Sequence, residues 1–156
     1  MTEPDPQDYP RAGLLRRFAA LLYDAFLVAA IWMFLGFMLQ LIFGPDTSQL
    51  VDGRVQTDPL LDSILFSLML VSCAGFYIWF WTHSGQTLGM LAWRLKVVTL
   101  DGGLINPIQG VIRFATAWPA FFMFGLGYLW LYIDPQGDAV HDKLSSTKVV
   151  VLHKSH

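Results

Sequence analysis

The sequence predicts an all-α integral membrane protein with two full transmembrane helices and a third apolar helical region. Apolar residues (AVILMFWYC) make up 54% of the 156-residue chain and charged residues only 14%, whereas a soluble domain has about 25% charged residues. Long uncharged runs recur along the chain, and about 20 such residues cross the hydrocarbon core of a bilayer. A small cytoplasmic β pairing of residues 95–100 and 147–152 is also expected, because LKVVTL and TKVVVL are alike and rich in β-branched residues.

The chain begins with a polar, proline-rich stretch, and residues 1–13 are expected to form a flexible cytoplasmic tail. The first span is expected at about 18–43. This run is too long for the apolar core of a signal peptide and has no small-residue cleavage site after it, so we interpret it as a retained helix. A single membrane domain is expected over 14–152, followed by a short tail at 153–156.

Residues 44–62 carry turn sequences (GPDTSQ, VDGR and TDP) and are expected to form a loop. The second span is expected at about 63–81. It is uncharged and ends in YIWFW, an aromatic cluster suited to the membrane interface.

The third apolar region, 107–133, contains Pro119 and two glycines in its apolar part. It is either a third span or a re-entrant hairpin broken at Pro119. Of the ten Lys and Arg residues, only Arg54 lies in the 44–62 loop. The positive-inside rule therefore places that loop outside and the N-terminus in the cytoplasm. The re-entrant alternative is favoured, because it keeps the basic residues of the C-terminal tail inside and lets the two KVV segments meet.

Composition and motifs also argue against several functions. The net charge of −2 does not favour a nucleic-acid partner. The single cysteine, Cys73, cannot form an internal disulfide, and no Cys/His spacing resembles a metal site. No catalytic Ser/His/Asp order and no cofactor motif emerges, so neither a cofactor nor enzymatic activity is expected.

The stretch RRFAALLYD, at the start of the first span, contains Arg17 and Asp24. Arg17 and Asp24 are i and i+7 on a helix, about 10 Å apart along its axis, so they cannot pair with each other. Asp24 lies either at the membrane edge or inside the membrane, where an unpaired charge costs about 3 kcal/mol. It is expected to pair with Arg113, to hydrogen-bond a hydroxyl group, or to bind a cation.

Three segments, RFAALLYD at 17–24, GQTLG at 85–89 and HDKLSSTKVV at 141–150, occur in order between the expected apolar runs. Together they resemble the motifs of the RDD family of membrane proteins, named for one arginine and two aspartates. The resemblance points to Arg17, Asp24 and Asp142 as the motif residues. It adds secondary candidates from the second and third segments: Gly85, Thr87, Gly89, His141 and Thr147.

The secondary candidates allow alternative roles. Gly85 and Gly89 are expected to form a tight turn, because they neither follow a strand nor open a predicted helix as a phosphate-binding loop would. His141 is expected to be a satisfied structural histidine beside Asp142, with proton sensing near neutral pH as the alternative. Arg17 and Asp142 are expected to form a structural latch between the tail and the first helix, and the alternative is a gate.

The resemblance implies a membrane location, and two activities are associated with members of the family: sodium–proton antiport and accessory roles in larger assemblies. We expect an accessory or scaffold subunit of the cell membrane, held together by Arg17, Asp24 and Asp142. The alternative is an oligomeric antiporter of monovalent cations and protons that uses Asp24. The expected partners are the lipid bilayer and either further copies of the chain or another membrane protein.

Overall fold

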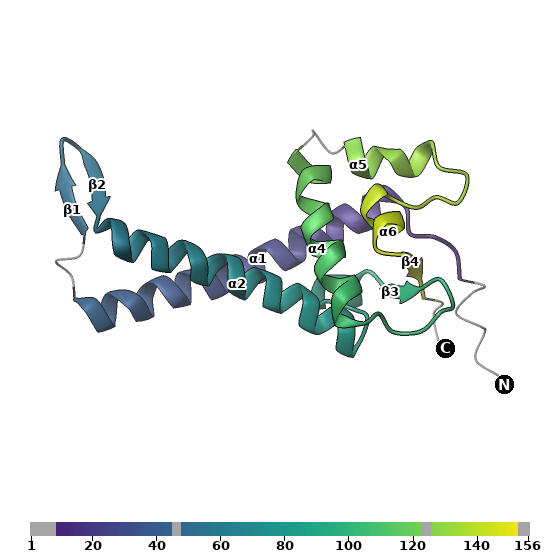
Figure 1. The fold of residues 1–156 in the computed structure, drawn as a ribbon, viewed down its shortest axis with the longest axis horizontal. Coiled ribbons are helices and arrows are strands. Elements are labelled where there is room, and N and C mark those ends of the chain that lie inside the picture. Colours follow the sequence, from purple (N-terminus) through teal and green to yellow (C-terminus); the bar gives the residue numbers. More distant parts are fainter. Residues whose placement is uncertain (1–8, 45–47, 123–125, 153–156) are drawn as a thin grey trace. The chain divides into compact units, whose positions relative to one another are not determined.

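The computed structural model describes residues 9–44, 48–122 and 126–152, and Figure 1 shows the order of their helices and strands. Residues 1–8 of the expected tail at 1–13, and the expected tail at 153–156, lie outside this range. The chain divides into two compact units. We call them the sheet unit, which lies within Met1–Asp24 and Tyr77–His156, and the hairpin unit, Ala25–Phe76.

The two predicted spans are present as long helices that each contribute to both units. Helix α1 covers Leu14–Phe43 and α2 covers Pro59–His83, so both extend beyond the predicted 18–43 and 63–81. Both are long and apolar enough to cross a membrane, and only 6% of the most apolar window of each is buried within the protein. Their apolar side chains are therefore available to contact lipid rather than a protein core.

The hairpin unit contains strands that the sequence analysis did not predict. Within the expected 44–62 loop, β1 (Ser48–Val51) pairs antiparallel with β2 (Arg54–Thr57). The two connecting residues, Asp52 and Gly53, have φ of 52° and 74°. Asp-Gly in this conformation matches the right-handed twist of a tight hairpin. The turn sequence was recognised, but its flanking strands are only four residues long and carry no clear alternation.

The sheet unit confirms the predicted pairing of the two KVV segments. Strand β3 (Leu95–Thr99) runs antiparallel to β4 (Thr147–Val151), with Val97 opposite Val149. A third segment extends this sheet: the Ala12 N–H donates to the Val149 carbonyl at 2.9 Å, and the Val151 N–H donates to Pro10 at 2.9 Å. Residues 10–12, assigned above to a flexible tail, are instead bonded to the free edge of β4.

Each strand of this sheet follows a five-residue helix. Helix α3 (Leu88–Ala92) precedes β3, and α6 (Val140–Leu144) precedes β4. The residue just before each strand lies in the left-handed region: Arg94 has φ 54° and Ser146 has φ 53°. The two helix–strand pairs thus repeat one local geometry, in which the end of a short helix lies next to the start of a strand.

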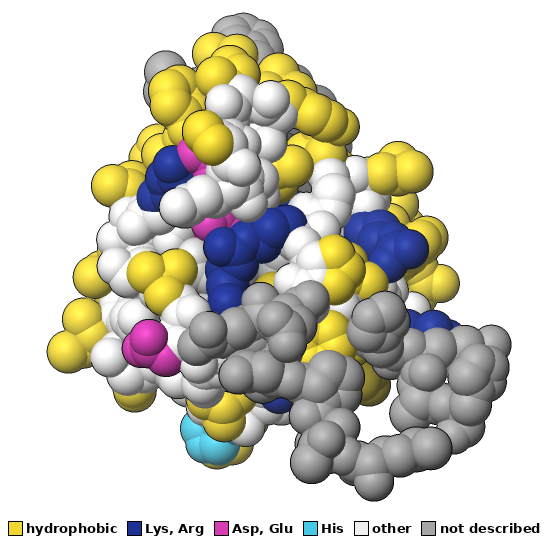
Figure 2. Space-filling model, turned by 90° about the vertical axis from the view of Figure 1, so that its right-hand side faces the viewer, with side chains coloured by type: hydrophobic (Ala, Val, Ile, Leu, Met, Phe, Trp, Pro, Cys, Tyr) yellow, Lys and Arg dark blue, Asp and Glu magenta, His cyan; other side chains and the backbone are white. Residues whose placement is uncertain are grey.

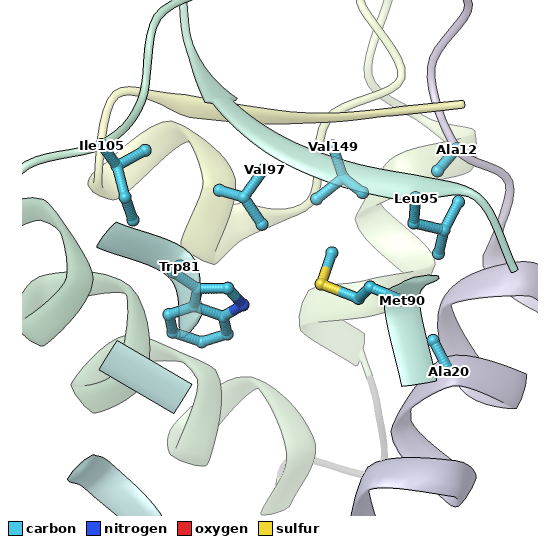
Figure 3. Packing of buried hydrophobic residues seen from close by; sticks show 8 residues of the cluster. All are labelled: Ala12, Ala20, Trp81, Met90, Leu95, Val97, Ile105 and Val149. Atoms are coloured by element: carbon cyan, nitrogen blue, oxygen red, sulfur yellow. The ribbon is translucent and has the colours of Figure 1, made fainter. Parts of the chain in front are cut away.

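The core of the sheet unit lies between the sheet and the helices. It consists of Ala12, Ala20, Trp81, Met90, Leu95, Val97, Ile105 and Val149. Figure 3 shows Met90 lying between Ala20 and the sheet, with the Trp81 indole near Val97. The first helix, the second helix and both strands are therefore joined by one apolar cluster, which fixes the polar groups around it.

The third apolar region forms helices, but the prediction of a break at Pro119 is wrong. Helix α4 runs over Pro107–Phe122 with Pro119 inside it. Helix α5 then covers Leu126–Leu129, and a 3-10 turn covers Trp130–Tyr132. Proline removes one N–H donor from a helix, and here the helix continues for one further turn beyond it. Among the described residues, only α1 and α2 are long and apolar enough to span a membrane.

Candidate functional site

The Asp142 carboxylate lies at the centre of a buried cluster of opposite charges. It is fully buried, at 0% exposure, and accepts hydrogen bonds from Arg17 Nη1 at 2.5 Å and from Arg113 Nη1. Its Oδ2 atom also accepts the Ala139 N–H at 3.1 Å, which caps the start of α6. We call Arg17, Arg113 and Asp142 the arginine–aspartate cluster.

Both arginines are fixed by further contacts. Arg17 Nε donates to the Ala12 carbonyl at 3.0 Å. Arg113 Nη1 also donates to Thr147 Oγ1 at 2.8 Å, and its guanidinium lies 5.2 Å from the centre of the Trp81 ring. The cluster therefore joins α1, α4, α6, the start of β4 and the N-terminal segment.

Burial opposes the charged form of Asp142, but the adjacent Arg113 and Arg17 outweigh it and hold the pKa of this carboxyl well below its usual range. Asp142 is thus an anion between two cations at every physiological pH. An acid of this kind does not give up or take up protons near neutrality, so its geometry suits holding elements together.

Asp24 belongs to a separate polar contact, the Asp24 cap, formed with Thr87 and Gly89. The Thr87 hydroxyl donates to Oδ2 at 2.5 Å, and the Gly89 N–H donates to Oδ1 at 2.9 Å. Thr87 Oγ1 in turn accepts the Met90 N–H at 3.2 Å as the N-cap of α3. The carboxylate therefore ties α1 to the N-terminus of α3, and together with Thr87 it satisfies two N–H groups that a helix start leaves without partners.

Of the alternatives for Asp24, the hydrogen bond to a hydroxyl is confirmed and the pair with Arg113 is wrong. Arg113 binds Asp142 instead. The sequence did identify Arg17 and Asp142 as partners, and the structure confirms them. Arg17 and Asp24, which helix geometry kept apart, have no contact with each other among these bonds.

Glycine is needed at the two glycine positions of the GQTLG loop for different structural reasons. Gly85 has φ +73°, and its carbonyl accepts the Val97 N–H at 2.7 Å along the outer edge of β3. At Gly89, an added Cβ would fall on the Ala20 carbonyl oxygen and 2.9 Å from Asp24 Oδ1. Glycine is required here because the two backbones approach so closely.

The expectation that this loop opens no helix is wrong, because Thr87 caps α3. A helix of five residues is too short to show a 3.6-residue period, so sequence periodicity could not find it. The signal available in the sequence was Thr87, a residue type common at helix N-caps, followed by a short apolar stretch.

His141 is buried beside the cluster, with its Nε2 atom 3.5 Å from Asp142 Oδ1 and its ring 4.8 Å from that of Tyr128. Burial is the main cause that lowers the pKa of His141 to about 3, with Arg113 and Arg17 acting in the same direction and Asp142 opposing them. The imidazole is thus neutral near pH 7, which contradicts a proton sensor in that range. Its Nδ1 atom has no hydrogen-bond partner among the described residues, so the histidine is structural but not fully satisfied.

Two further ion pairs, which the sequence analysis missed, hold the segment that leads into α6. Arg11 contacts Asp138 at 3.1 Å, and Lys143 pairs with Asp134. The Lys143 hydrogen bond lowers the pKa of Asp134, whereas burial raises that of Asp138 against the opposing charge of Arg11. Asp134 and Asp138 lie in a loop without periodicity, so the sequence offered no signal for their pairing.

In the described part of the chain, no group of three or more His, Cys, Asp or Glu side chains is arranged to hold a metal ion. The charged residues are instead paired with one another across elements that are distant in the sequence. Two long apolar helices joined to a unit with buried charge pairs define a membrane-type protein with an internal ionic lock.

Comparison with known proteins identifies the family. Residues 11–146 match the sequence profile of the RDD family, so this chain belongs to the RDD family. An uncharacterized protein of Rickettsia prowazekii (strain Madrid E) is 26% identical over 94 residues, which cover 58% of this chain and 51% of that protein. The chain thus spans about half the length of this curated relative. No solved structure matches the chain.

Proposed function

We propose that this protein is an accessory or scaffold subunit of a cell-membrane assembly, without enzymatic activity, and that its motif residues act as an internal latch. The observation that carries the proposal is that both motif aspartates are buried and hydrogen-bonded within the chain. Asp24 and Asp142 are 2% and 0% exposed, and both oxygens of each accept hydrogen bonds from other elements of the chain. Carboxylates that are fully paired within the chain stabilise its fold, and in this proposal the stabilised fold presents a surface that partner proteins bind.

The proposed topology is multi-pass, with the N-terminus and the sheet unit in the cytoplasm and the β1–β2 hairpin outside. It rests on the distribution of basic residues, of which Arg54 is the one within the expected external loop. The proposed partners are the bilayer and either further copies of the chain or another membrane protein. The length of α1, 30 residues or about 45 Å, allows it to cross the hydrocarbon core and continue into the sheet unit.

The antiporter alternative makes a different prediction about Asp24. A carboxylate that exchanges a cation for a proton must release its protein donors, and an amide cannot replace it. In the latch, Asp24→Asn keeps an oxygen that accepts the Gly89 N–H. Its side-chain N–H can donate a hydrogen bond to Thr87 Oγ1. The scaffold proposal therefore expects a modest loss of stability and no change in ion dependence.

The test measures cation and proton flux in proteoliposomes for the wild type, Asp24→Asn and a matched control, Asp62→Asn, whose side chain is exposed at the start of α2. Melting temperatures in sodium and choline salts accompany the flux. We expect no flux that depends on Asp24, and equal salt responses in all three proteins. Cation flux and sodium-specific stabilisation, both lost only in Asp24→Asn, would replace the scaffold by the antiporter.

A mass measurement after extraction in mild detergent tests the scaffold directly. The chain alone is 17.6 kDa, and we expect a protein mass above this value after the detergent is subtracted. A protein that is strictly monomeric and co-purifies with no membrane protein under these conditions would contradict the proposal.

A further inference from the structure

Helix α4 exposes a continuous apolar stripe. The exposed side chains recur at spacings of three and four residues, which is the repeat of one helix face. Several are largely open: Ile108 is 71% exposed, Val111 52% and Phe122 68%. The exposed residues of the stripe are Ile108, Val111, Ile112, Ala115, Trp118, Pro119 and Phe122.

The opposite face of α4 carries the charge. Arg113 is 4% exposed and binds Asp142, and Gly110 is buried against α2, where an added Cβ would lie 3.3 Å from Ile78. A helix that faces water places its polar residues outward and its apolar residues inward. In α4 the apolar residues lie outward and the charged Arg113 lies inward, so exposure of the outer face to water is unfavourable.

The segment after α4 continues the same surface. Tyr128 of α5 is buried against His141, while Leu126 and Leu129 of the same helix are exposed. Exposed apolar and aromatic residues then follow at Leu126, Leu129, Trp130, Tyr132 and Ile133. On the face drawn in Figure 2, charged side chains form several separate patches, one of them near the centre, and hydrophobic side chains occupy much of the edge.

The chain cannot use this region as a single crossing without separating the sheet. Strand β3 ends shortly before α4 and β4 begins soon after the 3-10 turn, and the two strands are hydrogen-bonded to each other. The region must therefore leave the sheet and return to the same side. Helix α4 has 16 residues, about 24 Å, which is shorter than the roughly 30 Å of the hydrocarbon core.

We propose that the outer face of α4, α5 and the 3-10 turn is embedded in the acyl chains of one leaflet, on the side of the sheet, without crossing the bilayer. We call this face the leaflet surface, with the residues given above. Lipid is its occupant because the stripe has no charged side chain. In the same unit, α1 is a helix long enough to span the bilayer and also exposes Leu15, Phe18 and Leu22, and the Phe18 ring lies 6.0 Å from the Tyr128 ring of α5. Trp118, Trp130 and Tyr132 are residue types that favour the boundary between headgroups and chains.

This placement goes beyond the latch and gives the arginine–aspartate cluster a location. Arg113 holds the inner face of α4 to α6 and to the start of β4, while the outer face of α4 is in lipid. The leaflet surface would thus anchor the sheet unit against the membrane independently of the two spans.

The test uses depth-dependent quenching of a fluorescent label. In a Cys73→Ser background, single cysteines replace Ile108, Phe122 and Ile133 on the leaflet surface, with Asp101→Cys in the exposed turn after β3 as the control. Each protein is labelled with an environment-sensitive probe and placed in nanodiscs whose lipids carry a nitroxide on the headgroup, near the carbonyl, or near the chain end. Because all four positions are exposed, the substitutions remove no core contact.

We expect the three leaflet-surface probes to be quenched most by the nitroxide near the carbonyl, and the Asp101 probe to be quenched by none of the acyl-chain nitroxides. Two results would overturn the proposal. Probes that escape lipid quenching and instead cross-link between copies would make this face a protein interface. Maximal quenching by the chain-end nitroxide at Phe122, with Ile108 and Ile133 near opposite headgroups, would make the region a span.

Discussion

At the scale of single residues, the cluster is asymmetric, because one carboxylate serves two arginines. Removing one arginine leaves the other paired with Asp142. Removing the acid leaves Arg17 and Arg113 buried together, at 5% and 4% exposure, without an anion between them. Breaking a buried pair costs far more than the pair contributes, because the remaining charge has lost its water and its partner.

Asp142→Asn should therefore lower the free energy of unfolding in detergent by about 3–5 kcal/mol, and Arg17→Gln should lower it by less. A double-mutant cycle of Arg17→Ala and Asp142→Ala should show a coupling of about 1 kcal/mol or more. Denaturant titration of the wild type, Asp142→Asn and Arg17→Gln measures the losses, and titration of the four proteins of the cycle measures the coupling. Strict additivity of the two losses would mean that these residues are not partners.

The neutral His141 makes stability depend on pH in a defined window. Its folded pKa is lowered to about 3 from an ordinary value of 6.5, so the unfolded chain binds the proton first as the pH falls. This contribution to stability is complete above pH 6.5 and declines toward pH 3, by about 1.4 kcal/mol per pH unit. Melting temperatures between pH 7 and pH 4.5 should fall more steeply in the wild type than in His141→Gln. His83→Gln, at an exposed position, should keep the wild-type slope, and an unchanged slope in His141→Gln would contradict this origin.

Sequence reasoning reached part of this site. Arg17 and Asp142 could be paired because Arg17 cannot pair with Asp24 on its own helix, and the resemblance to the RDD family marks Asp142 as the acid of the C-terminal tail. The partner of Arg113 could not be chosen, because an arginine in an apolar helix offers the same charge to Asp24 and to Asp142. Only the tertiary arrangement, with Thr147 and Trp81 around the guanidinium, decides between them.

At the scale of elements, the short helix α3 determines how the second motif works. Its N-terminal N–H groups bond to Thr87 and Asp24, and its backbone lies against α1 at Gly89. Predicting this from sequence would require knowing that α1 passes beside the loop. A glycine in a loop is compatible with many conformations, so the turn was foreseen and the close contact was not.

Gly89→Ala should force α3 away from α1 and destabilise the protein by about 1–3 kcal/mol, the usual cost of overpacking. Gly36→Ala is the matched control, because Gly36 is inside α1 and an added Cβ there meets nothing within 4 Å. That substitution should be neutral or stabilise the helix by up to about 1 kcal/mol. Thermal unfolding of both variants gives the comparison, and equal effects would argue against the close approach at Gly89.

At the scale of the whole molecule, pairing of β3 with β4 fixes the number of crossings between them as even. The strands were predictable because their sequences are alike and β-branched. The course of the apolar region between the two strands was not predictable, because apolar content alone is compatible with both a transmembrane span and a helix on the membrane surface. The proposed surface placement rests on the inward position of Arg113 and the outward apolar stripe, and both appear only after folding.

Cysteine labelling of intact cells and spheroplasts tests this topology in the Cys73→Ser background. Asp101→Cys precedes the third apolar region, Ser146→Cys follows it, and Asp52→Cys lies in the β1–β2 turn. An impermeant reagent should label Asp52→Cys from outside and leave the other two unlabelled until the membrane is opened. Labelling of Ser146→Cys but not Asp101→Cys from outside would establish a third crossing.

The contact between Arg17 and Asp142 has a consequence for how the protein is made. The two residues are 125 positions apart, and ribosomes add about 5–20 residues per second, so Arg17 waits about 6–25 s for its acid. During that time the first helix has entered the membrane, while its basic end and the N-terminal edge segment have no strand to join. The lock is complete only after Asp142 has been synthesised, so a chain that stops before Asp142 leaves Arg17 and Arg113 without the acid that they share.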